Sequence, residues 1–263
     1  MNKPYKLIRI TTVPLTLYVL LRQQLSFLSG YFDLGVISSP GAELDRLHKE
    51  TGIATHSVPM ERRIAPLKDL VSVWKMYWLL RKLKPDIIHS MTPKAGLVSM
   101  IAGFFAGVPC RIHTFSGLVF PARKGIMRRL LIFTDRLICL FATHLIPEGD
   151  GVKKDLQKVG ITRKPLEVVG YGSAVGLDTM YYSRDNALKV GMPDIREKLM
   201  YNSSDVVLLY VGRLVKDKGL VELVNAFLST GVNDGFLVVV EIDNKNQNVS
   251  INEIYDIIVS SEK

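Results

Sequence analysis

Short aliphatic and β-branched runs alternate with segments of helical periodicity along most of the chain. Runs such as Leu7 to Thr11, Leu34 to Ser38 and Cys110 to Phe115 have the length of strands, and the segments between them have the spacing of helices. This alternation is typical of a parallel sheet whose strands are joined by helical crossovers, so it predicts an α/β protein. The other runs that predict strands in the first part of the chain are Ala54 to Val58, Asp86 to His89, His144 to Ile146 and Leu166 to Val169.

The clearest βαβ unit lies between residues 86 and 115. A nearly wholly apolar helix from Lys94 to Ala106 joins the strands Asp86 to His89 and Cys110 to Phe115, with Pro109 in the turn. The helix before this unit is amphipathic, with one apolar face and basic residues elsewhere. Its apolar positions recur at i, i+3, i+4 and i+7, and they are Leu67, Leu70, Val71, Trp74, Tyr77 and Trp78.

The most glycine-rich stretch contains Gly170, Gly172 and Gly176 and predicts a hinge. We therefore divide the chain into residues 1–178, a complete Rossmann-like domain, and residues 179–263. In the second part, Asp205 to Val211 predicts a buried strand. A helix to about Leu228, a strand at 236–240 and a short amphipathic helix at 251–258 follow. Two strands and two helices are too few for a doubly wound domain, so we expect the second Rossmann-like domain to be incomplete.

The composition excludes several classes of protein. With 48% hydrophobic residues the chain can bury a sizeable core, and its two cysteines rule out a disulfide scaffold. We find no metal-binding motif, no phosphate loop, no signal peptide and no apolar run long enough to span a bilayer. The net charge of +9 favours an anionic partner. Nucleic acid is a poor candidate because the chain lacks a recognition helix and RNP-like aromatics.

Candidate ligand-binding residues lie where predicted strands end, as is usual in α/β proteins. Lys94 stands at a helix N-terminus that could hold an anion, although ordinary capping by Thr92 and Pro93 explains the same pattern. His113 ends the next strand, where a lone histidine is more often structural. The glycine segment up to Asp178 permits close approach to a ligand, and an interdomain hinge explains it equally well.

Two further segments carry cations that suit phosphate chemistry. Arg213 and Lys218 flank the start of a helix after a strand, an arrangement that fits a diphosphate but also an ordinary solvated loop. The helix from Arg123 to Phe141 is basic and amphipathic, so it fits either an anionic membrane surface or a core helix with a solvated basic face. Its cations away from the apolar stripe are Lys124, Arg128, Arg129 and Arg136.

Taken in order, these motifs resemble the retaining glycosyltransferases of family 4, which have the GT-B fold of two Rossmann-like domains. The resemblance is to the bacterial capsule and lipopolysaccharide branch and covers roughly residues 5 to 230. The matching stretches are Ser38-Ser-Pro-Gly41, Lys84-Pro-Asp-Ile-Ile-His-Ser90, Thr92-Pro-Lys-Ala-Gly96, Arg111-Ile-His-Thr-Phe-Ser-Gly117, Gly170 to Asp178, and Val211-Gly-Arg-Leu214 with Lys218-Gly219.

The resemblance implies transfer of a sugar from a nucleotide diphosphate donor, usually UDP-linked, to a polyprenyl-diphosphate oligosaccharide. It implies that Arg213 and Lys218 hold the donor diphosphate, and that Gly172, Ser173 and Asp178 line the cleft beside the donor. It also implies an acceptor-binding N-terminal domain on the anionic inner face of the cytoplasmic membrane. Such enzymes generally need no bound metal, so we expect no cofactor beyond the donor substrate.

The sequence departs from the family pattern at three places. Many relatives have histidines where Met91 and Ser116 stand, so catalytic roles for His113 and Ser116 beside the transferred sugar are hypotheses. The family's paired glutamates, seven residues apart, are not reproduced by Glu253 and Glu262. We therefore expect a truncated second domain. The alternative function is an inactive membrane-associated protein that binds the acceptor or a partner.

Overall fold

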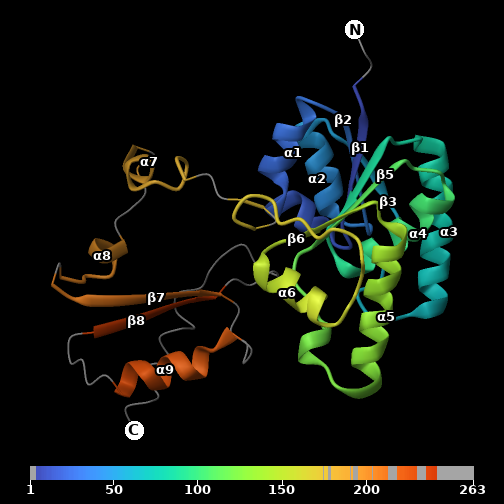
Figure 1. The fold of residues 1–263 in the computed structure, drawn as a ribbon. Coiled ribbons are helices and arrows are strands. Elements are labelled where there is room, and N and C mark those ends of the chain that lie inside the picture. The colour runs from blue at the N-terminus through green and yellow to red at the C-terminus, as the bar shows by residue number, and fades with distance from the viewer. Residues whose placement is uncertain are drawn as a thin grey trace. The chain divides into compact units, whose positions relative to one another are not determined.

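A computed structural model describes residues 4–173, 175–176, 179–189, 191, 195–202, 204–212, 218–229 and 235–241 (Figure 1). The chain forms two compact units, Met1–Leu177 and Asp178–Lys263. Each unit is described by itself below. The predicted roles of the two parts, acceptor side and donor side, remain predictions.

The first unit is built on a six-stranded parallel sheet with the order β3-β2-β1-β4-β5-β6. The strand β1 is internal, because it pairs with β2 on one side and with β4 on the other. A parallel sheet of this order is the Rossmann-like architecture that the alternating pattern predicts. The strands are β1 (Lys6–Ile10), β2 (Asp33–Ser38), β3 (Ala54–Ser57), β4 (Ile87–Ser90), β5 (Cys110–Phe115) and β6 (His144–Pro147).

Helices cover both faces of this sheet (Figure 1). On one face, α1 (Arg22–Ser29) and α2 (Ala42–Thr51) pack with a short π-helical turn, Thr16–Leu20, around the buried Leu25 and Leu47. On the other face lie α3 (Pro66–Leu83), α4 (Pro93–Phe105) and α5 (Gly125–Phe141). A 3₁₀ turn (Phe120–Ala122) precedes α5, and α6 (Asp150–Lys158) follows β6.

The middle helix of the second face, α4, is buried as its apolar sequence predicts. Seven of its residues are buried, and Gly103 lies so close to β4 that an added Cβ would stand 2.4 Å from the Ile88 side chain. Pro93 occupies the first turn, where its missing N–H costs nothing. Small residues therefore allow α4 to lie directly on the sheet.

The neighbouring helix α3 packs differently from its sequence pattern. The side chains that it buries are Ser72, Met76 and Leu80, which are not part of the apolar stripe read from the sequence. Of that stripe, only Tyr77 packs partly against the core. The other five side chains are exposed: Leu67, Leu70, Val71, Trp74 and Trp78. The helix is thus apolar on two sides, one toward the core and one toward solvent.

One predicted strand of the first unit is wrong. Residues 166–169 form no strand, and a single backbone hydrogen bond of 3.3 Å joins Glu167 N to the Leu145 carbonyl of β6. Pro165, directly before the segment, has no N–H to donate to a ladder, and Gly170, directly after it, turns the chain with a φ of +58°. Leu166 still packs into the core.

The second unit has two parallel strands, β7 (Val206–Gly212) and β8 (Gly235–Glu241), joined through α9 (Leu220–Ser229). Two short helices, α7 (Arg184–Lys189) and α8 (Ile195–Lys198), precede them. The prediction of a buried strand here is wrong, because Val206, Leu208, Leu209 and Val211 are all exposed. In the described part of this unit, helices do not cover both faces of β7. The helix predicted at 251–258 lies outside the described residues.

Candidate functional site

The ends of the first unit's strands meet at one edge of the sheet, which we call the C-terminal edge. Thr12 follows β1, and its Oγ1 lies 2.6 Å from Thr92 Oγ1, which follows β4. Thr12 Oγ1 also accepts a hydrogen bond of 3.2 Å from Ala95 N in the first turn of α4. The side-chain cap of α4 is therefore supplied by Thr12, which precedes Ala95 by 83 positions in the sequence. Thr92, directly before the helix, makes no side-chain cap bond of its own.

The same edge continues through β5 and β6 to the glycine segment. Ser116, directly after β5, is exposed and donates a hydrogen bond of 3.0 Å from its Oγ to the Met91 carbonyl. Glu148 follows β6; its N–H donates to the Phe115 carbonyl, and its own carbonyl accepts a 2.6 Å bond from Ser173 N. The structure thus brings Ser116 and Ser173 to one edge, although they are 57 positions apart in the sequence.

The glycine segment requires its glycine at position 172. Gly172 has a φ of +97°, and an added Cβ would stand 2.6 Å from the Glu148 carbonyl oxygen. Ser173 follows with a φ of +77°, an uncommon conformation for a residue with a side chain, and its Oγ accepts a bond of 3.2 Å from Gly176 N. The segment is therefore folded tightly onto the end of β6. The third predicted residue of this group, Asp178, lies outside the described residues.

His113 is buried inside the unit, with 1% of its surface exposed. Its Nδ1 is hydrogen-bonded to Ser90 Oγ at 2.8 Å, and its ring meets Phe115 edge-on at 4.6 Å between centroids. Burial lowers the pKa of His113 to about 3, so the imidazole is neutral at physiological pH. In this position His113 orders the ends of β4 and β5 from within.

The absence of a side chain at Gly96 in α4 makes room for this histidine. An added Cβ would stand 2.4 Å from His113 Cε1 and 2.7 Å from its Nδ1. We expect Gly96→Ala to lower the free energy of unfolding by about 1–3 kcal/mol, because the buried ring cannot move without disturbing Ser90. Chemical denaturation measures this change.

The matched control for that prediction is Gly151→Ala in α6, where an added Cβ meets nothing within 4 Å. This change is expected to raise stability by about 0.5–1 kcal/mol, the ordinary preference for alanine in a helix. Equal effects at the two glycines would contradict the packing explanation.

A second polar group lies on the other face of the sheet and was not predicted from the sequence. The guanidinium of Arg9 on β1 is hydrogen-bonded to His89 Nδ1 and to Gln24 Oε1, and His89 Nε2 lies 2.8 Å from Thr114 Oγ1. Burial lowers the pKa of Arg9 to about 10 and, together with the nearby Arg9 charge, lowers that of His89 well below its ordinary value. An arginine in the middle of an apolar strand is the signal that could have indicated this group.

Lys94 is half-buried and forms an ion pair with Asp69 of α3, with 2.5 Å between Nζ and Oδ2. Only 11% and 14% of the two side chains are exposed. An anion at the start of α4 would therefore have to compete with a carboxylate that already neutralises Lys94. Asp69 was not singled out in the sequence, where it reads as an ordinary residue of a helix's first turn.

In the second unit, Lys218 is exposed directly before α9, and Gly219 turns the chain with a φ of +72°. The Gly219 carbonyl accepts a bond of 2.9 Å from Leu223 N in the first turns of that helix. The position of Lys218 beside a helix N-terminus agrees with the sequence pattern. Its predicted partner Arg213 lies outside the described residues. No group of three metal-ligating side chains occurs in the described parts of the chain.

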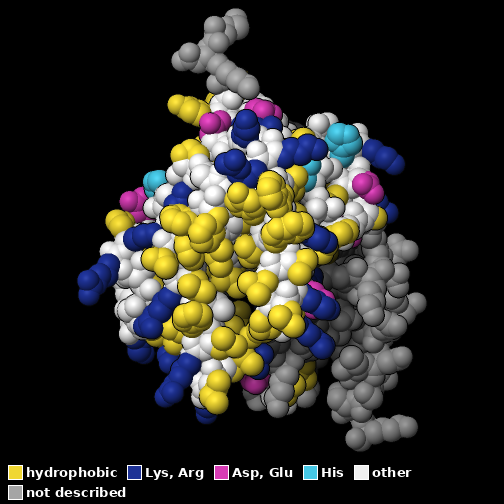
Figure 2. All heavy atoms as spheres, turned by 90° about the vertical axis from the view of Figure 1, so that its right-hand side faces the viewer, with side chains coloured by type: hydrophobic (Ala, Val, Ile, Leu, Met, Phe, Trp, Pro, Cys, Tyr) yellow, Lys and Arg dark blue, Asp and Glu magenta, His cyan; other side chains and the backbone are white. Residues whose placement is uncertain are grey.

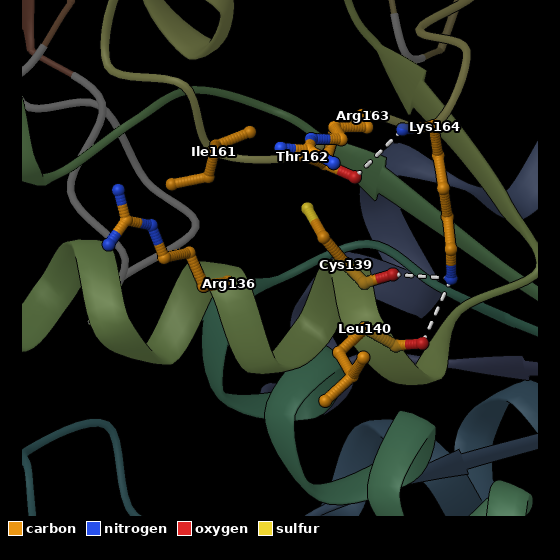
Figure 3. Close-up of a pocket in the computed structure, with 7 residues that line it drawn as sticks. All are labelled: Arg136, Cys139, Leu140, Ile161, Thr162, Arg163 and Lys164. Atoms are coloured by element: carbon orange, nitrogen blue, oxygen red, sulfur yellow. Dashed lines mark hydrogen bonds between the residues drawn. The ribbon is translucent and has the colours of Figure 1, made fainter.

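A surface pocket of about 340 Å³ lies at the end of α5, and none of the residues that line it was predicted to bind the donor or to act in catalysis (Figure 3). Lys164 reaches along its wall and donates to the last carbonyls of α5, those of Cys139, Leu140 and Ala142, at 2.5 to 2.9 Å. Burial raises the pKa of the Cys139 thiol to about 12, so it stays protonated. The pocket is therefore a helix terminus capped by a lysine rather than a reaction centre.

A parallel sheet with polar groups and a tight glycine segment at its C-terminal edge defines the class: a Rossmann-like α/β protein. Comparison with solved structures shows the GT-B fold. The Anabaena protein Alr3699/HepE, whose crystal structure holds UDP and glucose, matches with a TM-score of 0.66 at 20% identity, over 97% of this chain and 66% of that one.

Residues 32–172 match the family model described as "Glycosyl transferase 4-like domain". The chain belongs to this family of glycosyltransferases. It is 33% identical over 249 residues to the Staphylococcus aureus capsular polysaccharide biosynthesis glycosyltransferase CapM, covering 93% of this chain and 63% of CapM. It is 35% identical over 118 residues to an Escherichia coli UDP-Gal:alpha-D-GlcNAc-diphosphoundecaprenol alpha-1,3-galactosyltransferase, covering 41% of this chain and 30% of that enzyme. The chain thus spans less than two thirds of either relative.

Proposed function

We propose that the chain is a retaining glycosyltransferase of capsule or O-antigen biosynthesis that moves a sugar from a UDP-linked donor to a polyprenyl-diphosphate oligosaccharide. The observation that carries the proposal is the 33% identity to a capsular polysaccharide glycosyltransferase along 93% of the chain. The name of the second relative supports the chemistry, since it describes a UDP-sugar donor and a diphosphoundecaprenol acceptor.

In this proposal the C-terminal edge of the first unit faces the acceptor and the transferred sugar. Ser116 is exposed there and contacts the sugar with its hydroxyl, whereas the buried His113 positions the edge through Ser90. Gly172, Ser173 and Asp178 lie beside the donor, where the tight backbone allows close approach. No metal takes part, and the donor is a substrate rather than a bound cofactor.

The donor diphosphate is held by Arg213 and Lys218 in the second unit. Two cations and the N-terminus of α9 stabilise the negative charge that develops as the nucleotide departs. Lys94 supplies a further cation if an anion displaces Asp69 from it. The function of this residue therefore depends on opening one ion pair.

Because its acceptor is lipid-linked, the protein works at the inner face of the cytoplasmic membrane. The basic helix α5 is the first candidate for contact with that anionic surface, since Arg129 and Arg136 are exposed on it. Among the described residues, no helix is both long enough and apolar enough to cross a bilayer. The association we propose is peripheral.

Calorimetric titration with UDP and UDP-sugars tests the donor site. We expect saturable binding that weakens by at least about 10-fold in Arg213→Ala and in Lys218→Ala, because each removes a charge-assisted contact to the diphosphate. Lys158→Ala, an exposed lysine of α6, serves as the control and leaves the affinity unchanged. Equal affinity in all four proteins, or no binding by the folded wild type, would contradict the proposal.

A second function, holding the acceptor without transfer, is favoured by the paired Lys94 and the buried His113. An assay with a UDP-sugar and a polyprenyl-diphosphate acceptor separates the two functions. Transfer that is lost in His113→Ala supports the enzyme with a positioning role for this residue. Full turnover in that variant would remove His113 from the site, and liposome binding without transfer would favour the second function.

A further inference from the structure

Helices α3, α4 and α5 present a broad apolar surface to solvent, which we call the three-helix face. Figure 2 shows these side chains gathered on one side of the first unit, with lysines and arginines around them. The helices lie side by side, since α4 packs against both of its neighbours. The exposed apolar side chains are Leu67, Leu70, Val71, Trp74 and Trp78 on α3, Phe104 and Phe105 at the end of α4, and Ile126, Leu130, Phe133 and Leu140 on α5.

The spacing of these residues shows that the face is a continuous stripe on each long helix. On α3, Leu67, Val71, Trp74 and Trp78 follow one another at steps of four, three and four residues, so they share one side of the helix. On α5, Ile126, Leu130 and Phe133 repeat this spacing. Leu67 and Ile126 are 81% and 85% exposed. A contiguous patch of this kind marks an interaction surface, whereas scattered exposed leucines would not.

The unpaired charge around the face is mainly positive. The three helices carry eight cations, namely Lys68, Lys75, Arg81, Lys82, Lys94, Arg128, Arg129 and Arg136, and two acids, Asp69 and Asp135. Asp69 is paired with Lys94, Asp135 is buried, and Glu61, just before α3, is paired with Lys68. The other six cations have no partner among the described ion pairs, so the surface is apolar in the middle and mainly cationic around it.

We infer that the three-helix face inserts into the interface of an anionic lipid bilayer, with Trp74 and Trp78 at the headgroup level. Burial of apolar side chains in the membrane interface is favourable, tryptophan is enriched in the interfacial zone, and cations are attracted to anionic lipid. A second copy of the chain fits the face poorly. In a two-fold contact the same surface lies on both sides, so the cations of one copy would lie near the cations of the other and repel them. This inference rests on the lipid-linked acceptor of the proposed function and replaces electrostatic adhesion by α5 with insertion of three helices.

The protein carries its own reporter for this test, because its two tryptophans are both on α3. We would titrate the wild-type protein with phosphatidylcholine vesicles containing phosphatidylglycerol, and with vesicles of pure phosphatidylcholine. The expected result is a blue shift of tryptophan emission and co-sedimentation with the anionic vesicles. Brominated lipids should quench the emission, and salt should weaken the binding without abolishing the shift at saturating lipid.

Val71→Glu places a carboxylate in the middle of the face and leaves both tryptophans in position. We expect at least a tenfold loss of vesicle affinity. The matched control is Gln23→Glu, which makes the same charge change at an exposed position of α1, on the opposite side of the sheet. Val71 is 51% exposed, so the fold should withstand the change, and circular dichroism with thermal unfolding checks this.

Three outcomes would overturn the inference. The first is the absence of a shift and of co-sedimentation with either vesicle. The second is equal binding by Val71→Glu and Gln23→Glu. The third is a concentration-dependent shift without lipid and a dimer mass in sedimentation equilibrium, which would assign the face to a second copy. No sugar donor or acceptor is present in these experiments, so their failure would leave the proposed transfer activity standing.

Discussion

Replacing Asp135 by asparagine is expected to raise the free energy of unfolding at pH 8 by about 2–4 kcal/mol. This carboxyl is 7% exposed on the inner side of α5, and burial raises its pKa from 3.8 to about 7. Between these two values the folded protein keeps a proton that the unfolded chain has released. Stability therefore falls as the pH rises from about 4 to 7, and the full cost is present at pH 8. Asparagine has nothing to ionise and avoids this cost.

Urea denaturation at pH 8 and at pH 5 measures the change. The gain should shrink to about 1–2 kcal/mol at pH 5, where the cost to the wild type is smaller. Asp155→Asn, an exposed position of α6, is the control and should change stability little at either pH. A gain that is the same at both pH values would mean that the effect comes from packing and not from ionisation.

Lowering the pH from 7 to 5 is expected to cost the Asp135→Asn protein about 2 kcal/mol of stability through His113, and His89 adds a further cost of the same sign. Burial lowers the pKa of both imidazoles far below 6.5, to about 3 for His113. Below pH 6.5 the unfolded chain binds protons that the folded protein excludes. The stability contributed by these neutral histidines is therefore complete above their unfolded pKa and is lost as the pH falls.

The wild type should lose about 2 kcal/mol less over the same range, because protonation of Asp135 stabilises the fold in the opposite direction. Comparing the two proteins by denaturation at pH 7, 6 and 5 separates the contribution of the histidines from that of Asp135. Parallel curves for the wild type and Asp135→Asn would contradict the assignment of opposite signs to these groups.

Most of the first unit could be predicted because its sequence signals are local. Each predicted strand of the sheet lies within one residue at each end of an observed strand, except the segment Leu166 to Val169. That segment has strand composition, but pairing also depends on what flanks it, and here Pro165 and Gly170 stand on either side of the four residues. The strand β7 was predicted to be buried for a related reason. Aliphatic composition reports what a strand could bury and not whether a covering layer is present.

Sequence periodicity identified the apolar stripe of α3 but not the direction in which it points. Leu67, Trp74 and Trp78 form the stronger pattern, whereas the buried residues are Ser72, Met76 and Leu80, a weaker and partly polar set. Periodicity identifies an apolar face but does not show whether that face packs in the core or lies on the surface. Here most of the stripe is exposed, and it forms part of the surface that carries our second proposal.

The site could be predicted only as a set of strand ends. Parallel topology alone explains why Ser116 and the glycine segment reach the same edge. The partners of the predicted residues could not be found, since Lys94 meets Asp69 and Thr92 meets Thr12 across 25 and 80 residues of sequence. Nothing in the local pattern distinguishes these acids and hydroxyls from ordinary helix and strand residues. The roles of Arg213 and Asp178 remain predictions.

The internal position of β1 has a consequence for how the chain acquires its structure. Strands β1, β2 and β3 are close in sequence and have their own apolar core around Leu25 and Leu47. The other side of β1 pairs with β4, 80 positions further along the chain. Long-range parallel pairing is slow because a large loop must close before any contact is gained. During synthesis, therefore, the edge of β1 stays open until β4 has left the ribosome, and the nascent first half is the stage most exposed to mispairing.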